Sequence, residues 1–267
     1  MHRRLGGRRD RVAGSRRPSG GVAAIGTTTG RRSPLALWSA PRSRSTVFFR
    51  MMLERRDLLC LHEPFCNIAN DGSTEVDGLV LDSADRLIDV MLELSERRTV
   101  FFKDTTDCRY DVVFERPDFL RSTRHAFLLR DPREIIPSFA AMKPDMAVHE
   151  VGVEYLHRIY LAVLDAGGDA VVLDSDDFVD HPERTARAYC AAAGLPFDAG
   201  MLSWRPGDRP EWRQSAPWHV DVGASSTVRR RRTNYDRTID TDHLLRGFYE
   251  HHLPFYEYLR QRRVRLA

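Results

Sequence analysis

Residues 35–54 read Leu-Ala-Leu-Trp-Ser-Ala-Pro-Arg-Ser-Arg-Ser-Thr-Val-Phe-Phe-Arg-Met-Met-Leu-Glu. The stretch opens with a short apolar run, which predicts a buried strand over residues 35–38 that ends before Pro41. Apolar residues then recur at helical spacing from Val47, and Ser45 or Thr46 is expected to cap that helix. A strand therefore leads, through a basic and hydroxyl-rich turn, into the N-terminus of a helix.

This turn has the properties of an anion site. The first turn of a helix presents free backbone N–H groups, and the helix dipole favours negative charge there. Arg42 and Arg44 add charged donors, and the hydroxyls of Ser43, Ser45 and Thr46 add neutral ones. We expect a phosphate group, although the nucleotide P-loop pattern Gly-x-x-x-x-Gly-Lys-[Ser/Thr] is absent from the stretch. A surface turn with incidental Ser and Arg is the structural alternative.

The rest of the chain alternates strands with helices. Further buried strands are predicted at residues 58–61, 99–102, 125–129 and 170–173. Helices are predicted at residues 83–97, 117–121, 132–142, 148–164, 182–193 and 240–263, with a kink or break at Pro137 and an interruption at Pro254. Residues 66–79 and 201–232 are predicted to be loops, and residues 174–177 an acidic turn. This alternation predicts an α/β fold with a parallel central sheet flanked by helices on both faces.

Composition predicts one folded domain behind a basic tail. The 267 residues are 42% hydrophobic, enough for one α/β domain over residues 33–267, and no apolar run is long enough to span a membrane. Nine arginines and one aspartate lie in residues 1–32, which gives that segment +8 and leaves −5 of the net +3 for the rest. We expect the tail to be a disordered leader; binding of nucleic acid through it is the alternative that we do not favour.

Four cysteines, Cys60, Cys66, Cys108 and Cys190, have no spacing typical of a metal site. We therefore expect free thiols in a reducing cytoplasm, and no bound metal. A secretory signal would need an apolar core that the first residues lack.

Two motifs resemble those of the sulfotransferases that use 3'-phosphoadenosine 5'-phosphosulfate (PAPS). The turn Pro41-Arg42-Ser43-Arg44-Ser45-Thr46 is similar to their 5'-phosphosulfate loop, which usually reads Pro-[Lys/Arg]-Ser-Gly-Thr-[Thr/Ser]. Arg44 replaces the usual glycine and would be strained if that position requires a positive φ. Residues 127–139 resemble their 3'-phosphate motif, in which an apolar strand is followed by Arg-[Asn/Asp]-Pro and by a serine eight residues after the arginine. Arg130 and Ser138 match these two positions, and an arginine fork suits a phosphate.

The resemblance implies a P-loop NTPase-like sulfotransferase fold of the bacterial type. It implies transfer of a sulfuryl group from PAPS to a hydroxyl or amine of a small-molecule acceptor, without a metal. Arg42 would neutralise the leaving 5'-phosphate. Residues 225–232, with Arg229 and its three following arginines, are the candidate for the basic loop that grips the 3'-phosphate in this family, or are a solvated turn. Two alternatives stay open, namely a sulfotransferase-like nucleotide-binding protein without transferase activity and a P-loop kinase or NTPase.

The acceptor must lose a proton, so a base is expected. Many cytosolic sulfotransferases carry a catalytic His in Lys-Thr-His after the third strand, but here Thr105 stands in its place. Some bacterial sulfotransferases use a Glu after the second strand, and we predict Glu63 as the base, with His62 and Asp104 behind it. A salt bridge from Glu63 to Arg42 or Arg44 is the structural alternative. Lys103 is expected either to contact the sulfuryl oxygens or to pair with Asp104.

Overall fold

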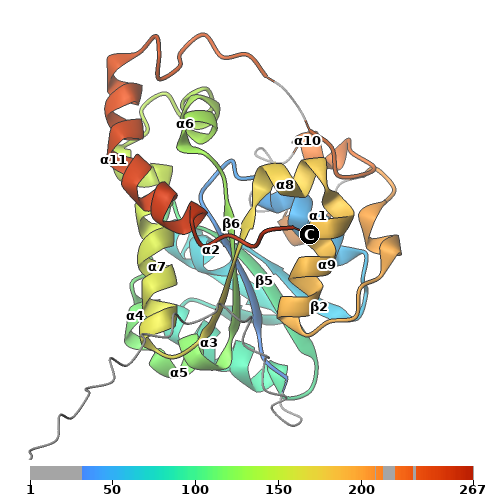
Figure 1. The fold of residues 1–267 in the computed structure, drawn as a ribbon. Helices are drawn as coiled ribbons and strands as arrows, with labels where there is room; N and C mark the ends of the chain where they lie inside the picture. The colour runs from blue at the N-terminus through green and yellow to red at the C-terminus, as the bar shows by residue number, and fades with distance from the viewer. Residues whose placement is uncertain (1–31, 208, 213–219, 231–232, 267) are drawn as a thin grey trace, which may run out of the picture. The chain divides into compact units, whose positions relative to one another are not determined.

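A five-stranded parallel sheet forms the centre of the protein (Figure 1). The computed structural model describes residues 32–207, 209–212, 220–230 and 233–266. The strands lie in the order β2-β5-β1-β6-β7. Their bounds are β1 Leu35–Ser39, β2 Leu58–His62, β5 Thr99–Thr105, β6 Arg124–Leu129 and β7 Asp169–Asp174. The predicted parallel α/β fold is therefore confirmed, and β1, the strand of the opening stretch, is its central strand. The predicted tail, residues 1–32, lies outside the described residues except for Arg32.

Strand β1 is buried on both sides because the sheet separates two apolar cores. Leu35 and Leu37 belong to one core, whereas Ala36 and Trp38 belong to the other. Successive side chains of a strand point to opposite faces, so an uninterrupted apolar run is what a central strand requires. Its register pairs Trp38 with Asp104 of β5 and with Phe127 of β6.

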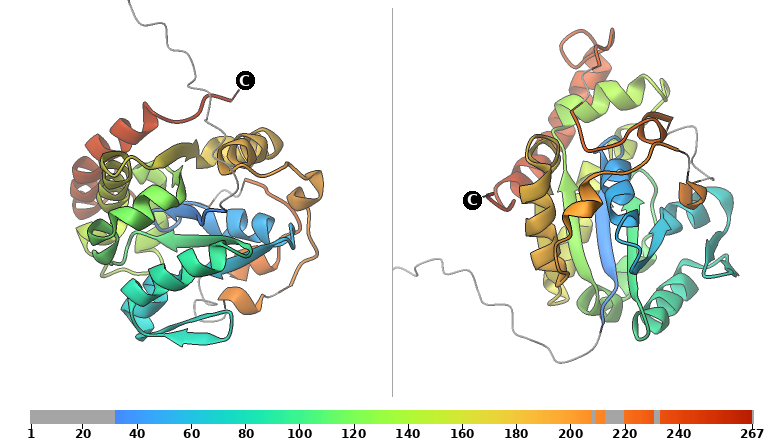
Figure 2. Two further views of the ribbon diagram at one scale, coloured as in Figure 1. Left: turned by 90° about the horizontal axis from the view of Figure 1, so that it is seen from below. Right: turned by 90° about the vertical axis from the view of Figure 1, so that its right-hand side faces the viewer.

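Helices cover both faces of the sheet (Figures 1 and 2). One core contains side chains from α1 (Ser45–Leu53), α8 (Ser175–Asp180) and α9 (Pro182–Ala193). The other contains side chains from the remaining long helices: α3 (Ala84–Ser95), α6 (Pro132–Ala140), α7 (Val153–Asp165) and α11 (His243–Arg260). Short elements complete the described fold: α2 Pro64–Asp71, β3 Thr74–Val76, β4 Leu79–Leu81, α4 Val112–Glu115, α5 Pro117–Ser122, η1 Val148–Val151, η2 Ala199–Leu202 and α10 Val220–Gly223.

The prediction of a loop over residues 66–79 was wrong. The segment holds most of α2, all of β3 and the first residue of β4, which pairs with β3 in antiparallel fashion. Helix α2 begins at Pro64, and the Asp104 carboxylate accepts hydrogen bonds from the backbone N–H groups of Phe65 (2.7 Å) and Cys66 (3.3 Å). The capping carboxylate belongs to a residue of β5 that lies 39 positions further along the chain. The sequence around Pro64 therefore contains no capping residue that would predict the start of the helix.

The helix predicted over residues 148–164 is divided at Gly152. Gly152 has φ +80° between η1 and α7, and its carbonyl accepts a hydrogen bond from Thr106 Oγ1 at 2.8 Å. A Cβ at this glycine would lie 2.7 Å from the same hydroxyl oxygen, which real structures avoid. The close approach of the β5 turn therefore breaks the helix.

Three further predictions about helix boundaries differ from the structure. Helices α6 and α11 run continuously through Pro137 and Pro254, so neither helix is broken at its proline, and a kink at Pro137 stays a prediction. The acidic turn at residues 174–177 is the start of α8, where the Asp174 carboxylate accepts hydrogen bonds from the N–H groups of Asp176 and Asp177. An aspartate in this position is an N-cap, which the sequence pattern also allows.

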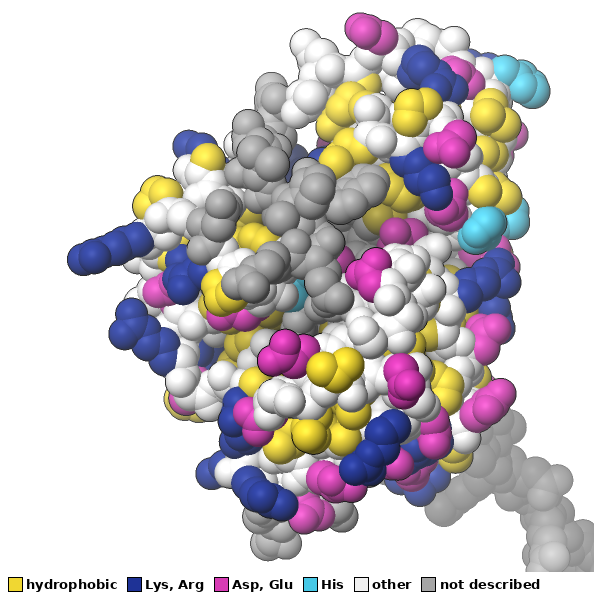
Figure 3. All heavy atoms as spheres, turned by 180° about the vertical axis from the view of Figure 1, so that it is seen from behind, with side chains coloured by type: hydrophobic (Ala, Val, Ile, Leu, Met, Phe, Trp, Pro, Cys, Tyr) yellow, Lys and Arg dark blue, Asp and Glu magenta, His cyan; other side chains and the backbone are white. Residues whose placement is uncertain are grey.

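No helix in the described ranges is long and apolar enough to cross a membrane. On the face seen in Figure 3, acidic and basic side chains are interspersed among the described residues. The four cysteines are all described, and each is a free thiol.

Candidate functional site

A cavity of about 470 Å³ lies at the carboxyl ends of the strands. Its lining comes from the turn between β1 and α1, from α2, from the end of β5 and its following turn, and from α6 and the segment after it. Arg229, Thr233 and Tyr235 also line it. Ligands of open α/β sheets bind at this edge, where neighbouring strands part. Both sequence motifs therefore contribute to one cavity.

The turn after β1 has an unusual backbone. Arg42 and Arg44 both have positive φ, at 60° and 67°. Arg44 is the N-cap of α1 and gives no side-chain hydrogen bond to the helix, so the predicted cap by Ser45 or Thr46 was wrong. The side chain of Ser43 is buried, and its Oγ has no hydrogen-bond partner among the described residues. A buried hydroxyl without a partner is costly, and a phosphoryl oxygen is an acceptor that would satisfy it.

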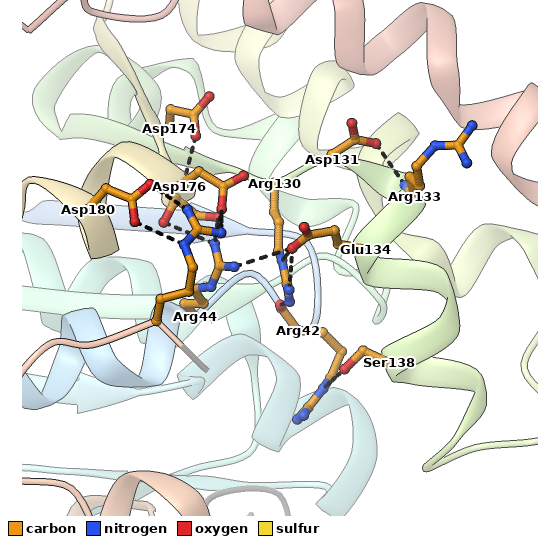
Figure 4. A network of polar contacts seen from close by, with 12 residues as sticks. Arg42, Arg44, Arg130, Asp131, Arg133, Glu134, Ser138, Asp174, Asp176 and Asp180 are labelled. Atoms are coloured by element: carbon orange, nitrogen blue, oxygen red, sulfur yellow. Dashed lines mark hydrogen bonds and ion pairs between the residues drawn. The ribbon is translucent and has the colours of Figure 1, made fainter. Parts of the chain in front are cut away.

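The two motifs are joined by direct contacts (Figure 4). Arg42 donates from Nε to Ser138 Oγ at 3.0 Å, and Arg130 donates from Nη1 to the Arg42 carbonyl at 2.5 Å. These residues are separated by 96 and 88 positions in the sequence. The fold thus places the arginine and serine of the second motif against the turn of the first.

A carboxylate network surrounds these arginines (Figure 4). Glu134 Oε2 accepts hydrogen bonds from Nε (3.1 Å) and Nη2 (2.6 Å) of Arg130, and one from Nη2 of Arg44 (3.3 Å). Arg44 also donates to Asp176 Oδ1 at 2.8 Å and to the buried Ser175. Burial and then the charge of Arg44 lower the pKa of Arg130 below its usual value. The cluster is therefore a site where extra negative charge would be stabilised.

Glu63 and Lys103 form an ion pair at the ends of β2 and β5. Both side chains are largely buried and both line the cavity. Glu63 has φ +50° and precedes α2 as its N-cap, and its N–H donates to the Lys103 carbonyl. Lys103 therefore pairs with Glu63 and not with Asp104, the partner that sequence analysis considered for it. The salt bridge of Glu63 with Arg42 or Arg44 stays a prediction. Strands β2 and β5 are neighbours, which sets Glu63 beside Lys103.

The two reserve candidates for a base do not line the cavity. Asp104 is buried and caps α2, and burial together with the charge of Glu63 raises its pKa to about 7. His62 is buried against the rings of Phe49 and Trp212. Their positions give both residues a packing or capping role.

Sequence analysis missed Asp107, which follows β5 and lines the cavity. Burial and the charge of Glu63 raise its pKa to about 6, and its Oδ1 is buried without a hydrogen-bond partner among the described residues. Its place two residues beyond the strand end was the available signal, because polar residues there face the ligand edge of the sheet.

One group of side chains could hold a metal ion. Donor atoms of Cys66, Asp107 and Cys108 all lie within 4.8 Å of one another, a cluster that the sequence spacing did not predict. Burial raises the pKa of the Cys66 thiol, which donates a hydrogen bond to the Thr105 carbonyl at 3.2 Å. A metal would therefore have to displace a proton that the fold retains.

The arginines of the basic segment after α10 have different surroundings. Arg229 lines the cavity, whereas Arg230 is held by Asp176 and Asp180, with contacts of 2.7 Å to each. The next two arginines of the run, residues 231 and 232, lie outside the described residues. Thr233 and Tyr235 also line the cavity.

Two solved structures of sulfotransferases match this chain at low sequence identity. A sulfotransferase from Alicyclobacillus acidocaldarius matches with 12% identity and a TM-score of 0.48, covering 87% of this chain and 97% of that one. The sulfotransferase domain from the curacin biosynthetic pathway matches with 17% identity and a TM-score of 0.44, covering 75% of this chain and 85% of that one.

Sequence comparisons give closer relatives. Branched-chain-amino-acid aminotransferase-like proteins 2 and 1 of Arabidopsis thaliana are 31% and 30% identical, each over 84% of this chain. The chain spans about 40% of the length of these curated relatives. The family model for the sulfotransferase domain matches residues 34–263, which include the turn after β1, both ion-paired strand ends and α6. This chain belongs to the sulfotransferase domain family.

Proposed function

We propose that the protein transfers a sulfuryl group from PAPS to a hydroxyl or amine of a small-molecule acceptor. The observation that carries this proposal is the pair of hydrogen bonds that joins Arg42 to Ser138 and Arg130 to the Arg42 carbonyl. An adenosine nucleotide with phosphates at both its 5' and 3' positions needs two anion sites at a fixed separation, and the joined motifs would supply them.

The turn after β1 would bind the 5'-phosphosulfate. Arg42 would neutralise charge on the leaving phosphate, and Arg44 stands on the same turn. Ser43, Ser45 and Thr46 would donate from hydroxyl or backbone groups at the start of α1. Because sulfuryl transfer, like phosphoryl transfer, places the attacking and leaving atoms in line, positioning and charge stabilisation would supply most of the rate.

Arg130 and Ser138 would bind the 3'-phosphate. Arg229 is the further candidate there, because it lines the cavity while Arg230 is tied to Asp176 and Asp180 on α8. The guanidinium of Arg130 already holds a carboxylate oxygen of Glu134. A phosphate dianion is a stronger acceptor for the same fork than one carboxylate.

Glu63 would accept the proton of the acceptor, and Lys103 would contact the sulfuryl oxygens. Of the three candidate bases, Glu63 is the one that lines the cavity. Its carboxylate is paired with the Lys103 ammonium group at the ends of β2 and β5. The same pair places a cation beside the oxygens on which charge changes during transfer.

A thermal-shift titration tests the co-substrate. A ligand that binds only the native state raises the melting temperature as its concentration passes the dissociation constant. We expect 3',5'-ADP to stabilise the protein, and 5'-ADP or ATP with Mg²⁺ to do so less. The response to 3',5'-ADP should be lost in Arg130→Ala and kept in Arg133→Ala, a control three residues further on in the first turn of α6 whose side chain is about half exposed. A preference for ATP with Mg²⁺ would instead indicate a kinase or NTPase.

Turnover separates the enzyme from a nucleotide-binding protein without activity. Incubation with PAPS and a panel of small alcohols and amines should release 3',5'-ADP above the rate of PAPS hydrolysis for at least one acceptor. Binding of 3',5'-ADP without such release from any acceptor class would favour the inactive alternative.

A further inference from the structure

The two sides of the cavity differ in charge. Four arginines line the side formed by the turn after β1, by the end of β6 and by residue 229, namely Arg42, Arg44, Arg130 and Arg229. The other side is formed by α2, by the end of β5 and by the segment after α6. The ends of β2 and β5 lie on one side of β1 and the end of β6 lies on the other. The segment after α6 reaches the turn after β5, where the Gly152 carbonyl accepts a hydrogen bond from Thr106 Oγ1.

Carboxylates exceed lysines on the second side. Glu63 pairs with Lys103, and Glu150 pairs with Lys143. Asp71 and Asp107 also line this side and have no lysine or arginine partner among the described residues. With two lysines against four carboxylates, the lining carries net negative charge where the acceptor would lie under the proposed function.

Asp107 is close enough to both ion pairs to interact with the charges of Glu63, Lys103 and Lys143. Its carboxylate is within 4.8 Å of the sulfur atoms of Cys66 and Cys108, which also line the cavity. Its Oδ1 is buried and has no hydrogen-bond partner among the described residues. The charges of Lys103 and Lys143 attract its carboxylate, whereas the charge of Glu63 repels it. A buried carboxylate oxygen of this kind is stabilised by a hydrogen-bonding cation.

We propose that the acceptor is an amino alcohol, whose protonated amine is held by Asp107 while its hydroxyl is presented to Glu63 and Lys103. The proposal rests on the proposed function, because it assigns the basic side of the cavity to the nucleotide. A neutral alcohol would offer Asp107 Oδ1 no charged donor, and an anionic acceptor would face the excess of carboxylates. A protonated amine satisfies the oxygen and neutralises part of the charge.

Binding to the complex with 3',5'-ADP tests this proposal without turnover. Calorimetric titration of the full chain, saturated with 3',5'-ADP, would compare 3-amino-1-propanol with 1,3-propanediol, which has the same carbon chain and no amine. We expect the amino alcohol to bind at least about tenfold more tightly, since a hydrogen bond to a buried charged group contributes roughly 1.5–3 kcal/mol. Equal binding of the two probes would overturn the proposal.

Two matched variants locate the effect. Asp107→Asn should remove the preference for the amino alcohol, whereas Asp71→Asn, which removes the same charge from an exposed position, should keep most of it. Equal losses in both variants would show a general charge effect and overturn the role of Asp107. A fall in turnover with the binding preference retained in Asp107→Asn would make Asp107 a base instead. The response to 3',5'-ADP reports separately on folding and on the proposed function, so its failure would be distinguished from a failure of this inference.

Discussion

At Arg44 a strained backbone destabilises the fold, whereas the contacts of its side chain stabilise it. Replacing Arg44 by glycine measures which of the two effects on the free energy of unfolding is larger. A non-glycine residue in the left-handed region destabilises the folded state by about 1–2 kcal/mol. Glycine removes this strain, but its more flexible unfolded chain offsets roughly 0.5–1 kcal/mol of the gain in stability. The backbone alone therefore predicts that Arg44→Gly stabilises the fold by about 0.5–1 kcal/mol.

The contacts of Arg44 work in the opposite direction. Its charged hydrogen bonds to Ser175, whose side chain is buried, contribute about 1.5–3 kcal/mol. Its ion pairs with Asp176 and Glu134 add only about 0.5 kcal/mol each, because those carboxylates are 38% and 43% exposed. We expect a net destabilisation of about 2 kcal/mol, which lowers the melting temperature by about 4–8 °C in a domain of this size.

Thermal unfolding followed by circular dichroism gives this number, and Arg56→Gly is the matched control. Arg56 has φ +58°, is exposed and has no hydrogen-bond or ion-pair partner among the described residues. Its replacement should raise the melting temperature by about 1–3 °C, since only the backbone contribution remains. If Arg44→Gly were as stabilising as Arg56→Gly, the contacts of Arg44 would contribute nothing and the reasoning would be refuted.

Three further predictions follow from the site. Glu134→Gln should tighten 3',5'-ADP binding about fivefold in a calorimetric titration, because it removes a half-exposed carboxylate that competes for Arg130; weaker binding would mean that Glu134 orients the arginine instead. Glu63→Gln should lower kcat by about 10²–10⁴ while leaving 3',5'-ADP affinity unchanged, and an unaltered kcat would exclude Glu63 as the base. Asp104 has a folded-state pKa of about 7, above the ordinary 3.8, so the folded state binds its proton more tightly and stability falls as pH rises between these values. Asp104→Asn should reduce that fall in melting temperature between about pH 4 and 7, and an identical pH profile would contradict the assignment.

Local patterns predicted the strands well because each is an uninterrupted apolar run between breaking signals. Strand β6 was predicted at residues 125–129 and lies at Arg124–Leu129, and β7 was predicted at residues 170–173 and lies at Asp169–Asp174. An uninterrupted apolar run is stable only where both of its faces are buried, as they are in a strand inside a parallel sheet.

What the sequence could not predict depends on partners distant along the chain. Helix α2 begins where a carboxylate of β5 caps it, and the break at Gly152 is made by a hydroxyl of the β5 turn. Sequence analysis expected strain at Arg44 if its φ were positive, and its φ is positive. The contacts with Ser175 and Asp176 that offset this strain form only in the folded sheet, so the sequence could not show them. Likewise, the pairing of Glu63 with Lys103 follows from the adjacency of β2 and β5, which no local pattern gives.

The strand order has a consequence for synthesis of the chain. Strand β1 is the first of the sheet to be made, yet its neighbours are β5 and β6, which begin at residues 99 and 124. At about 5–20 residues per second, the ribosome needs roughly 3–12 s after finishing Ser39 before it reaches Thr99. During that interval the apolar side chains of β1 have no sheet to enter. A nascent chain arrested before β5 should therefore be captured by chaperones that bind exposed apolar segments, and release should follow once β6 has emerged.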